Sequence, residues 1–149
     1  EKQIFDFAKE GMTFSDIFVF ADSIISKNGL RNNIVSITNP DGVNIGHTIP
    51  ASYEEWNKEE LKGLKNAGKD WTTFKSFVSN KRKFLSKSEY LNIIPGMAFT
   101  IEPALKNIKD DIVPMTMFHQ TATFKENGKK ELLTNLYKLF KSTNMDYML

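Results

Sequence analysis

One short segment limits the possible folds of this chain more than any other. Residues 93–105 form its longest apolar stretch, but Pro95 and Gly96 interrupt the stretch near its start and Glu102 places a single carboxylate inside it. The Pro-Gly pair predicts a turn, and Met97–Glu102 predicts the strand that follows. A charge in such surroundings costs several kcal/mol unless it is paired, hydrogen-bonded or bound to a metal. Glu102 is therefore the most informative residue about function.

The remaining sequence predicts short helices mixed with short strands. Thr13-x-x-Asp16 has the form of a capping box, and the apolar stripe after it predicts a helix over about residues 14–28 that ends before Gly29. A shorter helix is expected before Gly11. The other expected elements are strands at 34–37, 43–47, 112–118 and 121–124, a turn at 127–128 and a closing helix at 132–140. We therefore predict an α+β domain with a largely antiparallel sheet.

The stretch from Tyr53 to Tyr90 differs from its surroundings because it is rich in Lys, Glu, Ser and Asn. Its apolar residues predict two helices that separate near Gly68. Four aromatic residues at helical spacing are expected to lie in the core, and the alternative is that they stack on bases or peptides: Trp56, Trp71, Phe74 and Phe77. The basic run at 81–83 is expected to be a solvated helix end, and the alternative is contact with a phosphate or an acidic partner.

Length and composition exclude several classes of protein. The 149 residues suit one domain, and no apolar run approaches the roughly 18 residues of a membrane span, so we expect a soluble protein without a membrane partner. Cysteine is absent, which excludes disulfides and thiolate sites and fits a reducing compartment such as the cytoplasm. The net charge of +2 is too small to indicate a nucleic-acid partner by itself.

The two histidines of the chain are candidates for chemistry together with Glu102. His47 follows Gly46 at the end of a predicted strand, where a small neighbour would permit the close approach of a ligand or metal, and His119 lies between two predicted strands. A carboxylate with imidazoles is a ligand set for Mn, Co, Zn or Fe, and such a metal would activate water against a carbonyl. The alternative is structural: Glu102 pairs with a lysine or a backbone donor, and the histidines are core or surface residues.

Ten consecutive residues, Ile94–Pro103, combine the Pro-Gly turn with an apolar Thr-Ile-Glu-Pro strand. This segment resembles the PGM-x-FTIEP segment of the M24 metallopeptidases, the family of methionine and Xaa-Pro aminopeptidases, prolidase and creatinase. Three further segments resemble motifs of this family in the family's order: Lys9–Ile17, Gly46-His47 and Gln120–Gly128. Together the four segments span nearly the whole chain.

The resemblance implies the pita-bread fold, in which helices back an antiparallel sheet that holds two metals on its concave face. It implies His47 and Glu102 as metal ligands. His119 stands where the family has its last glutamate ligand, and Glu54 stands where it has a second, substrate-contacting histidine. The two aspartate ligands of the family precede the segment that resembles Lys9–Ile17, so this chain alone is not expected to hold a full two-metal site.

The resemblance further implies that residues 1–149 are the C-terminal part of one pita-bread domain, with a helical insertion at about 53–90. In its complete form we expect a metal-dependent aminopeptidase of the Xaa-Pro or methionine type. His47 and His119 would be its catalytic residues, with His119 as a third ligand or general acid/base. The alternative, favoured by His119 and Glu54, is a catalytically degenerate module that binds a peptide or protein. In either case a missing N-terminal segment or a second subunit is expected to cover the open sheet.

Overall fold

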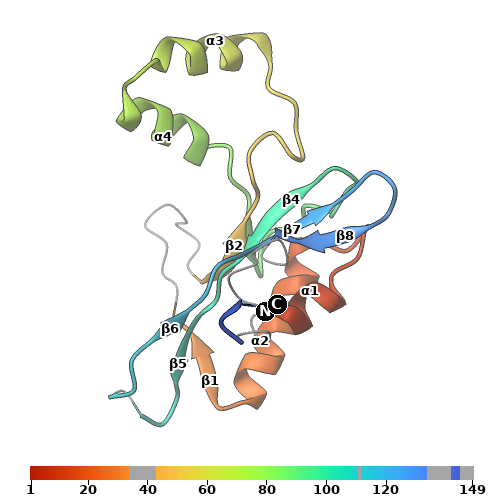
Figure 1. Cartoon of the computed structure of the whole chain (residues 1–149), viewed down its shortest axis with the longest axis vertical. Coiled ribbons are helices and arrows are strands. Elements are labelled where there is room, and N and C mark those ends of the chain that lie inside the picture. Colours follow the sequence, from red (N-terminus) through yellow and green to blue (C-terminus); the bar gives the residue numbers. More distant parts are fainter. Residues whose placement is uncertain (34–42, 111, 134–141, 145–149) are drawn as a thin grey trace.

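The computed structural model describes residues 1–33, 43–110, 112–133 and 142–144 (Figure 1). Every strand pair within these ranges is antiparallel, which confirms the predicted α+β mixture. The helices are α1 (Lys2–Phe7), α2 (Phe14–Lys27), α3 (Lys58–Ala67) and α4 (Trp71–Ser79). The strands are β1 (Leu30–Asn32), β2 (Asn44–His47), β3 (Phe84–Ser86), β4 (Ala98–Ile101), β5 (Ala104–Asn107), β6 (Thr116–Met117), β7 (Gln120–Phe124) and β8 (Lys130–Leu132).

Helix α2 begins where the sequence predicts it. The Thr13 hydroxyl accepts a hydrogen bond from the backbone N–H of Asp16 at 3.1 Å, and the Asp16 carboxylate accepts from the N–H of Thr13 at 2.9 Å. The pair thus satisfies two backbone donors that the first helical turn leaves free. The helix ends before Gly29, whose φ of +69° is accessible to glycine at little cost.

Strand β2 connects the parts of the sheet. It pairs with β3 on one side. On the other side it meets β4, where the backbone N–H of Ile49 donates to Ala98 O and that of Glu102 donates to Ile45 O, both at 2.8 Å. An antiparallel bridge between Thr48 and Phe99 lies between these two hydrogen bonds. Since β4 also pairs with β7 and β7 with β8, the strands run side by side in the order β3-β2-β4-β7-β8. Figure 1 shows β2, β4, β7 and β8 of this series.

Two segments of the chain, one running from β4 into β5 and the other from β6 into β7, bend together in the middle of the fold. The register pairs Ile101 with Gln120 in β4 and β7, and Ala104 with Met117 in β5 and β6. The same register therefore continues across the gap between the two ladders. Pro103 lies in that gap, and because proline has no N–H to donate, the ladder is interrupted there.

The core lies between helices α1 and α2 and the sheet, with α1 and α2 together on one side (Figure 1). Phe14 of α2 and Phe99 of β4 are fully buried and meet edge to face, with ring centroids 5.3 Å apart. Phe99 also stacks on Phe124 of β7 at 5.6 Å. Burial of aromatic side chains of this size dominates the stability of a small core, so this contact holds α2 and the central strands as one unit.

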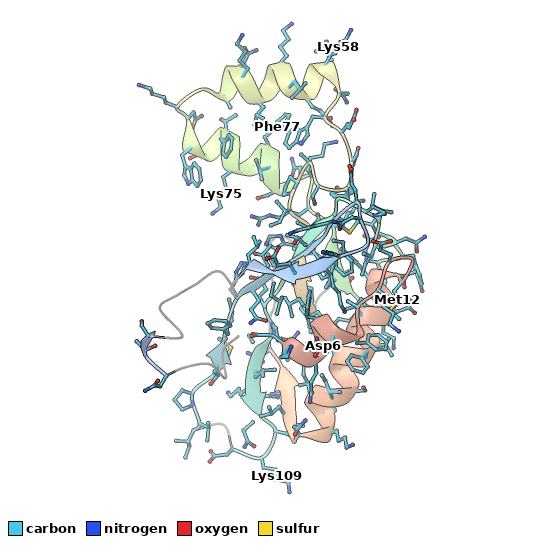
Figure 2. All side chains as sticks on the ribbon, turned by 45° about the vertical axis from the view of Figure 1, so that its right-hand side comes forward. Asp6, Met12, Lys58, Lys75, Phe77 and Lys109 are labelled. Atoms are coloured by element: carbon cyan, nitrogen blue, oxygen red, sulfur yellow. The ribbon has the colours of Figure 1, made fainter. Side chains whose placement is uncertain are left out.

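Helices α3 and α4 form a hairpin that projects from this body, between β2 and β3 in sequence (Figure 1). The structure confirms the two predicted helices, but the expectation that their aromatic residues lie in the core is wrong. Trp71 is 70% exposed and no residue of α4 is buried. Because the hairpin stands away from the sheet, its aromatic residues pack on one another, Trp56 on Phe77 and Trp71 on Phe74. Figure 2 shows Phe77 between the two helices.

Other expectations are corrected at the sheet's edges. Of the strand predicted at 112–118 only β6 forms, and Ile112 is 92% exposed. Leu132, predicted to begin the closing helix, lies in β8 instead, buried against the core. The strand predicted at 34–37 and the rest of that helix, 134–140, fall outside the described residues. Among the helices of the described ranges, none has the length and apolar character needed to cross a membrane.

Candidate functional site

The bend between β4 and β5 carries Glu102, and the facing bend between β6 and β7 carries His119. Continuing the register across the gap places these two residues opposite each other. Their side chains meet there: Nδ1 of His119 lies 3.1 Å from Oε2 of Glu102. The His119 side chain is 50% exposed whereas that of Glu102 is 14% exposed, so His119 is the more accessible of the two to solvent.

His47 reaches the same carboxylate from the other side. It ends β2, and its Nε2 lies 3.5 Å from Oε1 of Glu102. Its Nδ1 lies 2.9 Å from the backbone carbonyl oxygen of Thr48, and because that oxygen can only accept, Nδ1 carries a proton. The structure therefore brings together the three residues predicted as ligands, with Glu102 between two imidazoles. Their roles as metal ligands or catalytic groups stay predictions.

Thr100 fixes the geometry of this cluster. Its hydroxyl oxygen accepts a hydrogen bond from the backbone N–H of His47 at 2.9 Å and lies 3.2 Å from Oε1 of Glu102, to which it can donate. Thr100 is 1% exposed, so water does not compete for these contacts. The sequence reasoning assigned it no role. The sequence does carry a signal for this role, because Thr100 precedes Glu102 by two residues and residues two apart on a strand share a face.

Burial favours the neutral form of the His47 ring. Burial lowers its pKa below the ordinary histidine value, the nearby positive charge of Arg82 lowers it further, and the Thr48 hydrogen bond and the Glu102 charge act in the opposite direction. A neutral ring with its proton on Nδ1 turns the lone pair of Nε2 toward a carboxylate oxygen. Two acceptor atoms then face each other, an arrangement that a proton or a metal cation between them would stabilise.

This arrangement fits a divalent cation in its donor chemistry. Imidazole nitrogen and carboxylate oxygen are ligands of Zn, Mn, Co and Fe, and a backbone acceptor on the far nitrogen commonly orients a metal-binding histidine. Within the described ranges, however, no group of three or more acidic, histidine or cysteine side chains converges as a ready-made metal site. His47 and His119 contact different oxygens of Glu102.

Gly46 has a different role from the one expected. A small residue before His47 was predicted to let a ligand or metal approach, but the space is taken by the neighbouring strand. A Cβ added at Gly46 would lie 1.9 Å from the carbonyl oxygen of Thr100, and the φ of +152° is also one that other residues rarely adopt. Gly46 therefore allows β2 and β4 to come close enough to hold His47 beside Glu102.

A comparison with solved structures finds a similar fold in a peptidase. The chain superposes on the crystal structure of a dipeptidase from Pyrococcus horikoshii with a TM-score of 0.54 and 17% sequence identity. The match covers 89% of this chain and 27% of the dipeptidase, so the chain spans about a quarter of that protein's length. At this identity the similarity concerns the fold alone. No protein-family model and no curated protein sequence matches the chain.

Glu54 is not part of the cluster's contacts. Its carboxylate lies 3.1 Å from Nζ of Lys81, and the two residues line a cavity of about 390 Å³ at the base of the hairpin. Lys81 also pairs with Glu60 and lies over the ring of Trp56. Lys81, the first cation of the basic run at 81–83, is therefore engaged within the hairpin, so the expectation of a solvated helix end is wrong for this residue. Contact of the run with a phosphate or an acidic partner stays a prediction.

Proposed function

We propose that this chain is part of a metal-dependent peptidase of the M24, pita-bread type, whose site includes His47, Glu102 and His119. The observation that carries the proposal is the position of Glu102, the carboxylate of the IPGMAFTIEP segment, between the two imidazoles. The similarity to a dipeptidase fold supports it independently of the sequence motif.

In this proposal the three residues would hold the metal. A divalent ion bound there would polarise a peptide carbonyl and lower the pKa of a bound water. Thr100 orients Glu102 through its hydroxyl, and the Nδ1–H···O contact of His47 with Thr48 keeps Nε2 free to bind. His119, half exposed, is the group best placed to exchange a proton with solvent, so we assign it the role of general acid/base or third ligand.

The first experiment measures metal binding by the full-length protein. Mn²⁺ or Co²⁺ is titrated calorimetrically into the wild type, Glu102→Gln and Glu126→Gln, the last a carboxylate removed from an exposed turn. Glu102→Gln keeps the shape of the side chain but removes its charge, so the affinity should fall by at least about tenfold. Release of amino acids from dipeptides should fall with it, and Glu126→Gln should change neither. Absence of metal uptake by the full-length protein would overturn the catalytic proposal.

A second candidate function is a module of the same fold that binds a peptide or protein without cleaving it. Two observations favour it: an imidazole, that of His119, stands where the resemblance predicts a bridging carboxylate, and Glu54 is paired with Lys81 rather than directed at the cluster. His47→Ala distinguishes the candidates. Metal-dependent turnover should vanish in this variant if the protein is an enzyme, whereas partner binding should survive if it is a binding module.

A further inference from the structure

The tip of the α3–α4 hairpin exposes an aromatic surface. Trp71, the first residue of α4, is 70% exposed. Its ring stacks on that of Phe74, with the ring centroids 5.5 Å apart and an angle of 21° between the planes. Because Phe74 covers one side of the indole and most of Trp71 remains in contact with water, the other side of the indole is open to a further flat ring.

Three lysines flank this aromatic pair in the chain. Lys65 lies in the last turn of α3, and Lys69 lies in the connection between the two helices. Lys75 follows Trp71 by about one turn of α4, and Figure 2 shows it on the side of α4 that faces away from α3. All three lysines are exposed, and among the residues that the structure describes none of the three takes part in an ion pair. The tip therefore combines an exposed ring with three unpaired cations.

The cations continue along the outer face of α3. Lys58, Lys62 and Lys65 are four and three residues apart, so their side chains lie on one face of the helix. Gly63 faces α4 instead, because a Cβ added there would lie 2.9 Å from the ring of Phe77. Figure 2 shows Phe77 between the helices and Lys58 on the side of α3 turned away from α4. Like charges at this spacing repel and weaken a helix, and an anion that runs along α3 would remove the repulsion.

The acidic residues of the hairpin are engaged elsewhere or lie away from the tip. The carboxylate of Asp70 caps α4, where it accepts hydrogen bonds from two backbone N–H groups at 3.0 and 3.4 Å. Glu60 pairs with Lys81 at the base of the hairpin. Glu59 lies in the first turn of α3, at the end of the helix away from the tip. Positive charge therefore dominates toward the tip.

We propose that the tip of the hairpin and the outer face of α3 bind single-stranded nucleic acid, with a base stacked on Trp71 and the phosphates held by the lysines. Proteins that bind single strands combine a cationic track for the backbone with aromatic rings for the bases, and the hairpin carries both. An acidic peptide would use the lysines but leave Trp71 unused. A membrane surface would need a larger apolar tip, whereas the residues next to Trp71 are Asp70 and Thr72. Because lysines bind phosphate as point charges, the surface should not select a base sequence.

The test adds the full-length protein to fluorescently labelled oligothymidylate of about twelve nucleotides and measures anisotropy at several salt concentrations. Stacking is followed by the quenching of tryptophan emission, since Trp71 is one of only two tryptophans in the chain. The stacking variants are Trp71→Ala and Trp71→Phe. Tyr90→Ala is their control, because Tyr90 is 73% exposed and lies outside the hairpin. A triple lysine variant of the hairpin is compared with a control that removes the same charge at exposed positions elsewhere: Lys62→Gln, Lys65→Gln and Lys69→Gln against Lys87→Gln, Lys109→Gln and Lys129→Gln.

We expect the oligonucleotide to bind the wild type and to quench its tryptophan emission. The logarithm of the affinity should fall with the logarithm of the salt concentration by about 0.7 for each phosphate contact, so the hairpin triple variant should reduce this slope by about 2. Trp71→Ala should bind about 5- to 150-fold more weakly with an unchanged slope. Trp71→Phe should recover most of this loss, because it keeps a ring. Both controls should bind like the wild type.

Several results would overturn the inference, and polyglutamate and phosphatidylserine vesicles serve as the other probes. Equal binding of polyglutamate and the oligonucleotide would indicate an acidic protein partner, and binding of the vesicles alone would indicate a membrane. Equal losses in the two triple variants would indicate a diffuse field rather than a site. Full affinity of Trp71→Ala, or no binding of the oligonucleotide to the wild type, would also refute it. Because the surface excludes His47, Glu102 and His119, each of these results leaves the proposed function unaffected.

Discussion

Replacement of Gly46 by alanine tests whether the contact between β2 and β4 holds the site together. The new Cβ would lie 1.9 Å from the carbonyl oxygen of Thr100, whereas real Cβ contacts stay beyond 3.0 Å, so the strands must separate by about 1.1 Å. The bonds from Glu102 N to Ile45 O at 2.8 Å and from His47 N to the Thr100 hydroxyl at 2.9 Å would then exceed hydrogen-bonding distance.

The expected loss of stability follows from these contacts. Two hydrogen bonds contribute about 0.5–1.5 kcal/mol each, and an unfavourable backbone conformation for alanine adds about 1–3 kcal/mol. Gly46→Ala should therefore lower the free energy of unfolding by about 2–6 kcal/mol, measured by urea denaturation. It should also move the NMR signals of both site histidines.

Gly11→Ala is the matched control for this prediction. Gly11 also has a positive φ, +82°, but no atom lies within 4 Å of the position that an alanine Cβ would take there, so the variant carries the conformational strain without the collision. Gly11→Ala should therefore lower the free energy of unfolding by only about 1–2 kcal/mol. If the two variants unfold at the same urea concentration, or if Gly46→Ala leaves the histidine signals in place, the close approach of β2 and β4 does not position the site.

Three further changes test other parts of the fold. Lys130 Nζ donates to three carbonyl oxygens at the end of α1. Lys130→Met should therefore lower the free energy of unfolding, measured by urea denaturation, by about 1–3 kcal/mol. Lys129→Met, at an exposed position, should lower it by less than about 0.5 kcal/mol. In metal-free protein the folded pKa of His47 lies below its unfolded value near 6.5, so the unfolded chain binds the proton more tightly. Stability therefore falls as the pH decreases through the unfolded pKa of His47. His47→Gln should flatten this pH dependence in denaturation series between about pH 5 and 8. Lys81→Met removes the pairs with both glutamates, so limited proteolysis should cut the α3–α4 hairpin faster without lowering the unfolding midpoint of the body.

Local chemistry made several features predictable from the sequence. The capping box at Thr13 and Asp16 is a contact between residues three apart, so the start of α2 needs no knowledge of the rest of the chain. The strand before Glu102 was equally readable, because a Pro-Gly turn and an apolar run both point to it. The grouping of His47, Glu102 and His119 was anticipated through the family resemblance and not from periodicity.

Features that depend on distant contacts were not predictable in this way. The helical spacing of Trp71 and Phe74 is the same whether a helix lies in the core or projects from it, so periodicity could not reveal that the hairpin stands away from the sheet. Gly46 looked like an opening for a ligand because its real neighbour, Thr100, is far away in sequence. Leu132 joins β8 because pairing with β7 buries it, a tertiary effect that overrides its local pattern.

The position at which the α3–α4 hairpin joins the sheet also makes the hairpin replaceable. Thr48 and Lys83 are the last residues that join its two ends to each other, through hydrogen bonds, while Ile49 beyond Thr48 still donates to Ala98 of β4. Its two ends are thus only about 5 Å apart, the spacing of adjacent strands, so a two-residue turn could splice them without shifting the register beneath. The chain could gain, lose or swap whatever is carried at this point while the neighbouring His47 keeps its position.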